Sequence, residues 1–292
     1  MKHLKIIWNW TAMVGFSLLT CFLAACVATH SGKDTASKDL FNGKDLNGWY
    51  TYQKSPEATS IVKGLKMKAG KYVEPIGLNK DPLDVFTVVL EDGQPAIRIS
   101  GETFGILVTD EEYENYHLSL EFKWGNKKFP PREDKKRDSG VLYHSIGKEG
   151  AWGGVWMKSI ECQVQEGDVG DLICVDSTAV QVRVFEKGRK YEPTGELKVF
   201  YRGGSDYCDK SADFEKEHGE WNLLELYVYE RESIHIVNGE ENMHLYNIGQ
   251  IVDGKIEPLT KGKIQLQSEG AEIFYRNIRI EPIREMPILN KN

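Results

Sequence analysis

The segment 116–124 has the most regular hydrophobic pattern in the chain. Every second residue is apolar, and the residues between them are polar. Successive side chains of a β-strand point to opposite faces, so this alternation predicts a strand with one face on a core and one polar face. The apolar face would carry Tyr116, Leu118, Leu120, Phe122 and Trp124, and the polar face His117, Ser119, Glu121 and Lys123.

Strand signals recur from Asp39 onward. Short runs of β-branched and aromatic residues alternate with Gly, Asp, Asn and Pro clusters, and no stretch keeps a 3.6-residue period for three turns. We expect an all-β domain of about a dozen strands, which fits a sandwich of two antiparallel sheets. The charged, proline-broken segment 127–138 is expected to be an exposed loop. The other clear strand candidates are 86–90, 96–100, 141–145, 160–165, 180–185, 223–229, 234–237, 263–267 and 272–280.

The N-terminus follows a different pattern. Lys2, His3 and Lys5 precede an apolar stretch, 11–22, that ends in Leu23-Ala24-Ala25-Cys26. This stretch is too short for a membrane span and is typical of a signal peptide. The last four residues resemble the bacterial lipobox, which implies that Cys26 becomes the lipid-modified first residue.

These features predict four segments. They are a lipoprotein signal peptide (1–25), a small and polar tether (26–38), a β-sandwich domain (39–284) and a C-terminal tail (285–292). The protein would be anchored in the bacterial cell envelope through its lipid alone. The residues after Cys26 lack an acidic run, which favours an outer-membrane position facing the periplasm.

Charge and cysteine content exclude some functions. Among 292 residues the formal net charge is −7, and removal of residues 1–25 would take away two lysines and lower it to −9. A chain without a basic cluster does not favour nucleic acid as a partner. Cys162, Cys174 and Cys208 remain after Cys26, and no C-x-x-C pair is present. We therefore expect buried free thiols rather than a zinc site.

One predicted strand carries a row of hydrogen-bonding side chains. If Ile160, Cys162 and Val164 enter the core, then Glu161, Gln163 and Gln165 project from the other face at a spacing of ~7 Å. Such a row suits a sugar, although it is equally compatible with an ordinary hydrated face.

Two other segments support sugar binding. In 263–269, Gln265, Gln267 and Glu269 point away from Ile264 and Leu266. Glutamine is a poor strand former, so its repetition indicates a specific role. The segment 138–145 leads into a glycine-rich loop, 147–157, whose Trp152 and Trp156 would either stack on a sugar ring or pack on the domain.

His144 is compatible with a base, a metal ligand or a surface histidine. The nearby carboxylates Glu166, Asp168, Asp171 and Asp176 do not have the spacing of a calcium loop, so a divalent metal is left open. The chain has no phosphate-binding loop, nucleophile elbow, His-Glu-x-x-His or dinucleotide fingerprint.

The order of several motifs resembles the 3-keto-disaccharide hydrolase family. The motifs span about Leu40 to Glu281 and comprise segments 40–49, 139–141, 161–163, 220–222 with Asn238-Gly239, 262–267 and 274–280. The resemblance implies a concanavalin-A-like jelly roll, a secreted or lipid-anchored location, and action on glycosides oxidised at C3. The chain departs from the family pattern at Asp138, where Asn is usual, and at Gln165 and Glu166.

A ketone at C3 makes the C2 proton acidic, so a base can remove it and the enolate can expel the glycosidic oxygen. For this reaction we expect Glu161 or His144 as the base, with Gln163, Gln267 and Lys123 binding the substrate or the enolate. Arg276 would add positive charge, and a divalent ion could replace part of this stabilisation. The expected sugar contacts also include Glu121, Tyr143, Trp152, Trp156 and Gln165.

Two alternatives are open. Segment 161–166 resembles the strand of laminarinase-type glucanases, with Glu161 and Glu166 as the two carboxylates. Strict alternation would send these two to opposite faces unless a bulge intervenes. The other alternative is a carbohydrate-binding lipoprotein without catalysis, because lectins share this sandwich.

Overall fold

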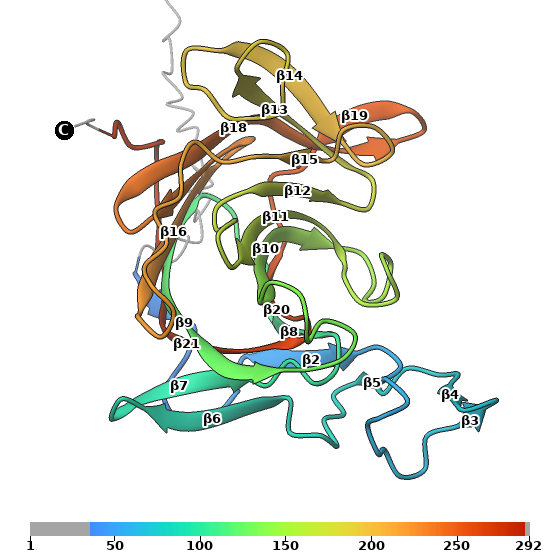
Figure 1. The fold of residues 1–292 in the computed structure, drawn as a ribbon. Helices are drawn as coiled ribbons and strands as arrows, with labels where there is room; N and C mark the ends of the chain where they lie inside the picture. Colours follow the sequence, from blue (N-terminus) through green and yellow to red (C-terminus); the bar gives the residue numbers. More distant parts are fainter. Residues whose placement is uncertain (1–35, 290–292) are drawn as a thin grey trace, which may run out of the picture. The chain divides into compact units, whose positions relative to one another are not determined.

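The computed structural model describes residues 36–289 (Figure 1). These residues form 21 strands and no helix, so none of them forms a helix that could span a membrane. The expected all-β class is confirmed as a jelly-roll sandwich of two large antiparallel sheets. The predicted signal peptide, Cys26 and nearly all of the predicted tether lie outside the described residues.

The larger sheet, sheet A, has eleven strands. The short strands β1 (Lys38–Asp39) and β19 (Lys255–Pro258) pair with β21 and β18 respectively. The other nine run in the order β14 (Glu196–Tyr201), β13 (Thr178–Val184), β18 (Glu240–Val252), β17 (Glu232–Val237), β16 (Asn222–Tyr229), β9 (Tyr116–Lys128), β21 (Ala271–Pro282), β7 (Gln94–Ile99) and β6 (Phe86–Glu91).

The smaller sheet, sheet B, has eight strands. A separate hairpin, β3 (Met67–Lys68) and β4 (Lys71–Tyr72), belongs to neither sheet. The order in sheet B is β15 (Tyr207–Cys208), β12 (Leu172–Val175), β11 (Lys158–Gln165), β10 (Asp138–Ile146), β20 (Lys263–Ser268), β8 (Gly105–Thr109), β2 (Trp49–Gln53) and β5 (Gly77–Leu78).

The core lies between the two sheets. Phe122 and Tyr275 from sheet A and Val141 and Cys162 from sheet B are fully buried members of one continuous cluster. Each sheet therefore turns one face inward, and alternation leaves a second, outer face on each. Cys162, Cys174 and Cys208 are buried free thiols, as expected.

The predicted strands all coincide with observed ones, but the sequence missed several others. All five residues of β8 are buried, so that strand shows no alternation. The register of β18 shifts against both β13 and β17, which breaks its pattern of two. The predicted loop 127–138 is confirmed in outline, since β9 ends at Lys128 and β10 begins at Asp138.

Candidate active site

The outer face of sheet B carries a block of polar side chains at its centre. Residues 160, 162 and 164 of β11 enter the core, so Glu161, Gln163 and Gln165 turn outward. Glu161 and Gln163 are nonetheless almost completely buried, at 4% and 6% exposure. The structure thus brings the two predicted rows, on β11 and β20, onto one shielded surface, with β10 between them.

Glu161 reaches into a hollow that Gly140 leaves in this surface. The register places Gly140 beside Gln163 on β11, and Val141 beside Leu266 on β20. A methyl group added at Gly140 would lie 2.4 Å from Glu161 Oε1 and 3.2 Å from Gln267 Oε1. Both side-chain oxygens therefore lie in the space next to the Gly140 Cα, which the Cβ of any other residue would occupy. Gln267 Oε1 is buried and has no hydrogen-bond partner within residues 36–289.

Arg132 connects two further carboxylates beside the hollow. Its Nη2 forms an ion pair with Asp138 Oδ2, and its Nη1 lies 3.3 Å from Glu269 Oε1. Gln165 Nε2 donates to Asp138 Oδ2 at 2.6 Å. Arg132 Nε and Asp138 Oδ1 are buried without partners among the described residues. Buried polar atoms are normally paired, so this cluster offers a donor and an acceptor to a ligand.

Burial raises the pKa of all three carboxyl groups. The pKa of Asp138 is raised to about 6, because burial outweighs the opposing effect of Arg132. Burial, and then the charge of Asp138, raises the pKa of Glu269 to about 8. Burial, followed by the charges of Asp138 and Glu269, raises the pKa of Glu161 well above its usual range. The pKa of Asp138 thus lies below that of Glu269, and carboxyl groups with raised pKa values in one site suit acid and base roles.

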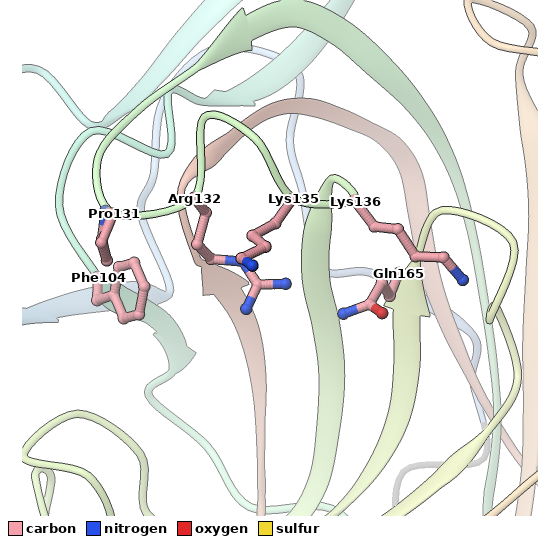
Figure 2. A pocket seen from close by; sticks show the side chains of 6 residues that line it. All are labelled: Phe104, Pro131, Arg132, Lys135, Lys136 and Gln165. Carbon is pink, nitrogen blue, oxygen red and sulfur yellow. The ribbon is translucent and has the colours of Figure 1, made fainter.

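A pocket of about 470 Å³ opens beside this cluster. Arg132 and Gln165, which both contact Asp138, line it together with Phe104, Pro131, Lys135 and Lys136. Figure 2 shows Phe104 and Pro131 at one end, Lys136 and Gln165 at the other, and Arg132 and Lys135 between them. A ligand in this pocket would therefore lie next to the carboxyl cluster.

The tryptophan loop, residues 147–157, covers another part of the same face. Val155 and Met157 pack with Ile106 and Val108 of β8. Trp156 packs against Phe104 with ring centroids 6.4 Å apart, so it supports the wall of the pocket. The Trp152 ring is instead covered by the Arg202 guanidinium, 3.7 Å from the ring centroid. Of the two predicted stacking residues, only Trp156 contacts a residue that lines the pocket.

Three predicted substrate contacts lie on the wrong sheet. Glu121 and Lys123 of β9, and Arg276 of β21, are on the outer face of sheet A. Arg276 forms an ion pair with Glu121, and Lys123 binds Asp92 at 2.7 Å. The expectation that they share a site with Glu161 is wrong, because the whole core separates the two outer faces.

Tyr143 and His144 are also placed differently from the prediction. Tyr143 points into the core, where its hydroxyl binds Ser233 Oγ at 2.6 Å and His235 Nε2 at 3.0 Å. His144 lies at a bulge of β10 with a φ of 51°, and both its ring nitrogens are buried without partners among the described residues. Burial lowers its pKa to about 3, so the ring is neutral at pH 7. Within residues 36–289, no contact joins His144 to the carboxyl cluster.

Glu161 and Glu166 do not lie on one face of β11, as the predicted pair of catalytic glutamates would require. The register between β10 and β11 is unbroken from Tyr143 opposite Ile160 to Asp138 opposite Gln165, so no bulge brings Glu166 to the face of Glu161. The Glu166 carboxylate instead lies 3.0 Å from Arg137 Nη1.

No group of three or more His, Cys, Asp or Glu residues within 36–289 is arranged to hold a metal ion. Two of the acidic side chains near β11 already have protein partners. Asp168 binds Lys136 Nζ at 2.6 Å, and Asp171 accepts from the backbone N of Lys210 at 2.8 Å.

Several residues of the site were missed from the sequence. Glu269 was seen in its row but not assigned, and Asp138 was noted only as a departure from a motif. Arg132 lies in the loop that was expected to be hydrated, yet its side chain is only 22% exposed. The one signal that could have found Arg132 is its place in a charged loop leading directly into Asp138-Ser139-Gly140.

A family model described as the 3-keto-alpha-glucoside-1,2-lyase-like domain matches residues 36–281. The chain belongs to this family. The match includes every residue of the carboxyl cluster and of the pocket, and it makes the chain a carbohydrate-active protein. The resemblance to 3-keto-disaccharide hydrolases is thereby confirmed.

The fold is similar to solved structures, at low identity. Two are candidate glycosyl hydrolases from Parabacteroides distasonis. The first is 20% identical with a TM-score of 0.47 and covers 85% of this chain and 100% of its own. The second is 19% identical with a TM-score of 0.46 and covers 88% and 99%. A galectin-like protein from Bacillus subtilis is 10% identical, has a TM-score of 0.41 and covers 68% and 88%. No curated protein matches the chain.

Proposed function

We propose that this protein cleaves glycosides whose sugar is a 3-keto sugar, by elimination across C1 and C2. The observation that carries the proposal is the carboxyl cluster. Asp138 and Glu161 are buried and Glu269 is partly buried. They lie beside Arg132, which lines an open pocket, in a chain of the 3-keto-glucoside lyase-like family.

The contacts and the pKa shifts of these groups suggest how the roles divide. Asp138 has a lower pKa than Glu269, and its Oδ1 is a buried acceptor without a partner in residues 36–289, so its carboxylate takes the C2 proton, and the resulting enolate expels the oxygen on C1. Glu161, which burial keeps protonated, gives a proton to that leaving oxygen. Arg132 Nε, a buried donor without an acceptor in residues 36–289, would stabilise the enolate oxygen at C3. The products are an unsaturated keto sugar and the free alcohol.

Water completes a net hydrolysis. Addition of its oxygen to C1 and of a proton to C2 turns the unsaturated keto sugar into a free 3-keto sugar. The same two carboxyl groups serve this step in reverse roles, as Glu161 is ionised and Asp138 protonated after the elimination. A lyase would release the unsaturated sugar before this addition.

The test is turnover by the purified wild-type protein. We expect release of sugar from 3-keto-trehalose or a 3-keto-β-glucoside, with a transient ultraviolet absorbance of the enone, and no release from unmodified β-glucan. Parallel reactions with EDTA show whether a divalent ion contributes. If neither keto substrate turns over while the protein still binds sugars, the non-catalytic carbohydrate-binding alternative replaces this proposal.

The proposal includes a location in the bacterial cell envelope. Residues 1–25 are removed, and Cys26 carries the lipid that holds the protein in the outer membrane, facing the periplasm; the sequence Leu23-Ala24-Ala25-Cys26 supports this. Mass spectrometry of the N-terminal peptide should find a lipid thioether on Cys26, and Cys26→Ser should release the protein from membranes. A mature chain that starts at another residue would contradict it.

A further inference from the structure

The pocket next to the carboxyl cluster has an unusual charge for this protein. The chain is acidic, with a formal net charge of −7. The pocket, however, is lined by Arg132, Lys135 and Lys136 and by no carboxylate. Basic side chains gathered in an acidic protein favour an anionic ligand, because the local potential attracts negative charge.

The three basic side chains that line the pocket differ in whether they form ion pairs with carboxylates of the protein. Arg132 is shared by Asp138 and Glu269, and Lys136 binds Asp168 at 2.6 Å. Lys135 Nζ, in contrast, has no acidic partner among residues 36–289, and Figure 2 shows its side chain beside Arg132. Lys135 is therefore the positive charge that remains for a ligand.

The end of the pocket farthest from Lys136 and Gln165 is apolar. Phe104 and Pro131 line it, and Trp156 packs behind the Phe104 ring. Lys54 Nζ lies 3.8 Å from the centroid of that ring, which adds a second cation without an ion pair in the described part of the chain. The pocket thus combines an apolar wall, formed by Phe104 and Pro131, with the positive charge of Lys135.

We propose that this pocket is the leaving-group subsite, and that it takes a leaving group in which an apolar ring carries an anion such as a carboxylate. This inference rests on the proposed function. The sugar lies against the carboxyl cluster, where Arg132 and Gln165 line the pocket, and its C1 substituent extends along the pocket, with the ring on Phe104 and the anion at Lys135.

Two isosteric substrates test the inference. They are the 3-keto derivatives of 4-carboxyphenyl and 4-carbamoylphenyl glucoside, which differ in charge but hardly in shape. We expect the wild type to favour the carboxylate by about tenfold in kcat/KM at low salt, and less at high salt because ions screen the attraction. Lys135→Gln should abolish the preference. Lys255→Gln, an exposed lysine in β19 of sheet A, should retain it.

The outcomes separate this inference from the proposed function. Turnover of both compounds at equal rates overturns the subsite and leaves the proposed function intact. If neither turns over, calorimetric titration with the unoxidised glucosides decides. Tighter binding of the carboxylate, lost in Lys135→Gln, supports an anion subsite while the proposed reaction fails. Equal or undetectable binding of the two overturns the subsite as well.

Discussion

The outer faces of the two sheets come from the same sequence pattern and have opposite chemistry. On sheet A the outward side chains neutralise one another, since Arg276 binds Glu121 and also lies 3.8 Å from the Trp221 ring centroid. On sheet B, Glu161 lies in a covered hollow with a raised pKa, and Gln267 Oε1 lacks a partner in residues 36–289. Ion pairs between partly exposed side chains indicate a structural surface, whereas buried groups left unpaired indicate a site prepared for a ligand.

The largest expected effect comes from Glu161. Glu161→Gln keeps the shape of the protonated carboxyl but removes its proton donor, so kcat/KM on an alkyl 3-keto-glucoside should fall about 100-fold or more. The loss should be much smaller on the 4-nitrophenyl analogue, whose leaving group needs no proton. The matched variant Glu121→Gln on sheet A should stay within about twofold of wild type. An equal loss on both substrates would instead make Glu161 the base.

A smaller effect is expected from filling the hollow. In Gly140→Ala the new methyl group would displace the Glu161 carboxyl, so kcat should fall by about tenfold or more, while the melting temperature changes little because a flexible side-chain end yields. Gly125→Ala is the control, since its methyl group would meet Glu272 Oε2 at 2.5 Å, away from the site. Equal activities of the two variants would remove Gly140 from the catalytic geometry.

The smallest effect is on stability against pH. Glu269 has a folded-state pKa of about 8, above its usual value of 4.5, so between these values the folded protein binds more protons than the unfolded chain. Its contribution to the free energy of unfolding therefore falls as pH rises from about 5 to 8. Glu269→Gln should melt about 3 °C or more above wild type at pH 8, and the difference should shrink at pH 5.

Melting curves of Glu121→Gln, recorded at the same pH values, provide the control for the loss of a carboxylate from sheet A. A Glu269→Gln variant that melts below wild type at pH 8 would show that the Arg132 ion pair outweighs the cost of burying the carboxylate.

The sequence was sufficient for the sandwich and for half of the site. The period of two in 116–124 and 160–165 identified the strands and the outward direction of Glu161 and Gln163, because side-chain direction in a strand is local. It could not say which outer face a row belongs to, and this is why Lys123 and Arg276 were grouped with Glu161. That assignment depends on which strands pair, which is a long-range property.

Loop residues were the other limit. Arg132 is charged and lies in a proline-broken segment, so an exposed position was the natural expectation. Its burial depends on carboxylates that come from β10 and from the end of β20. Likewise, the bulge that encloses His144 without partners for its ring cannot be seen in the alternation of 141–145.

Loop 129–137 supplies four of the six residues that line the pocket: Pro131, Arg132, Lys135 and Lys136. The acidic and amide groups of the hollow come instead from strands or, for Glu269, from the residue that follows β20. Lys135, the cation assigned to the leaving group, thus lies in a stretch of chain separate from the strands that carry Asp138 and Glu161. An exchange of residues 133–137 that keeps Arg132 should therefore alter the preference for the leaving group without altering the sheet or the enolate contact, which makes this segment a module for engineering.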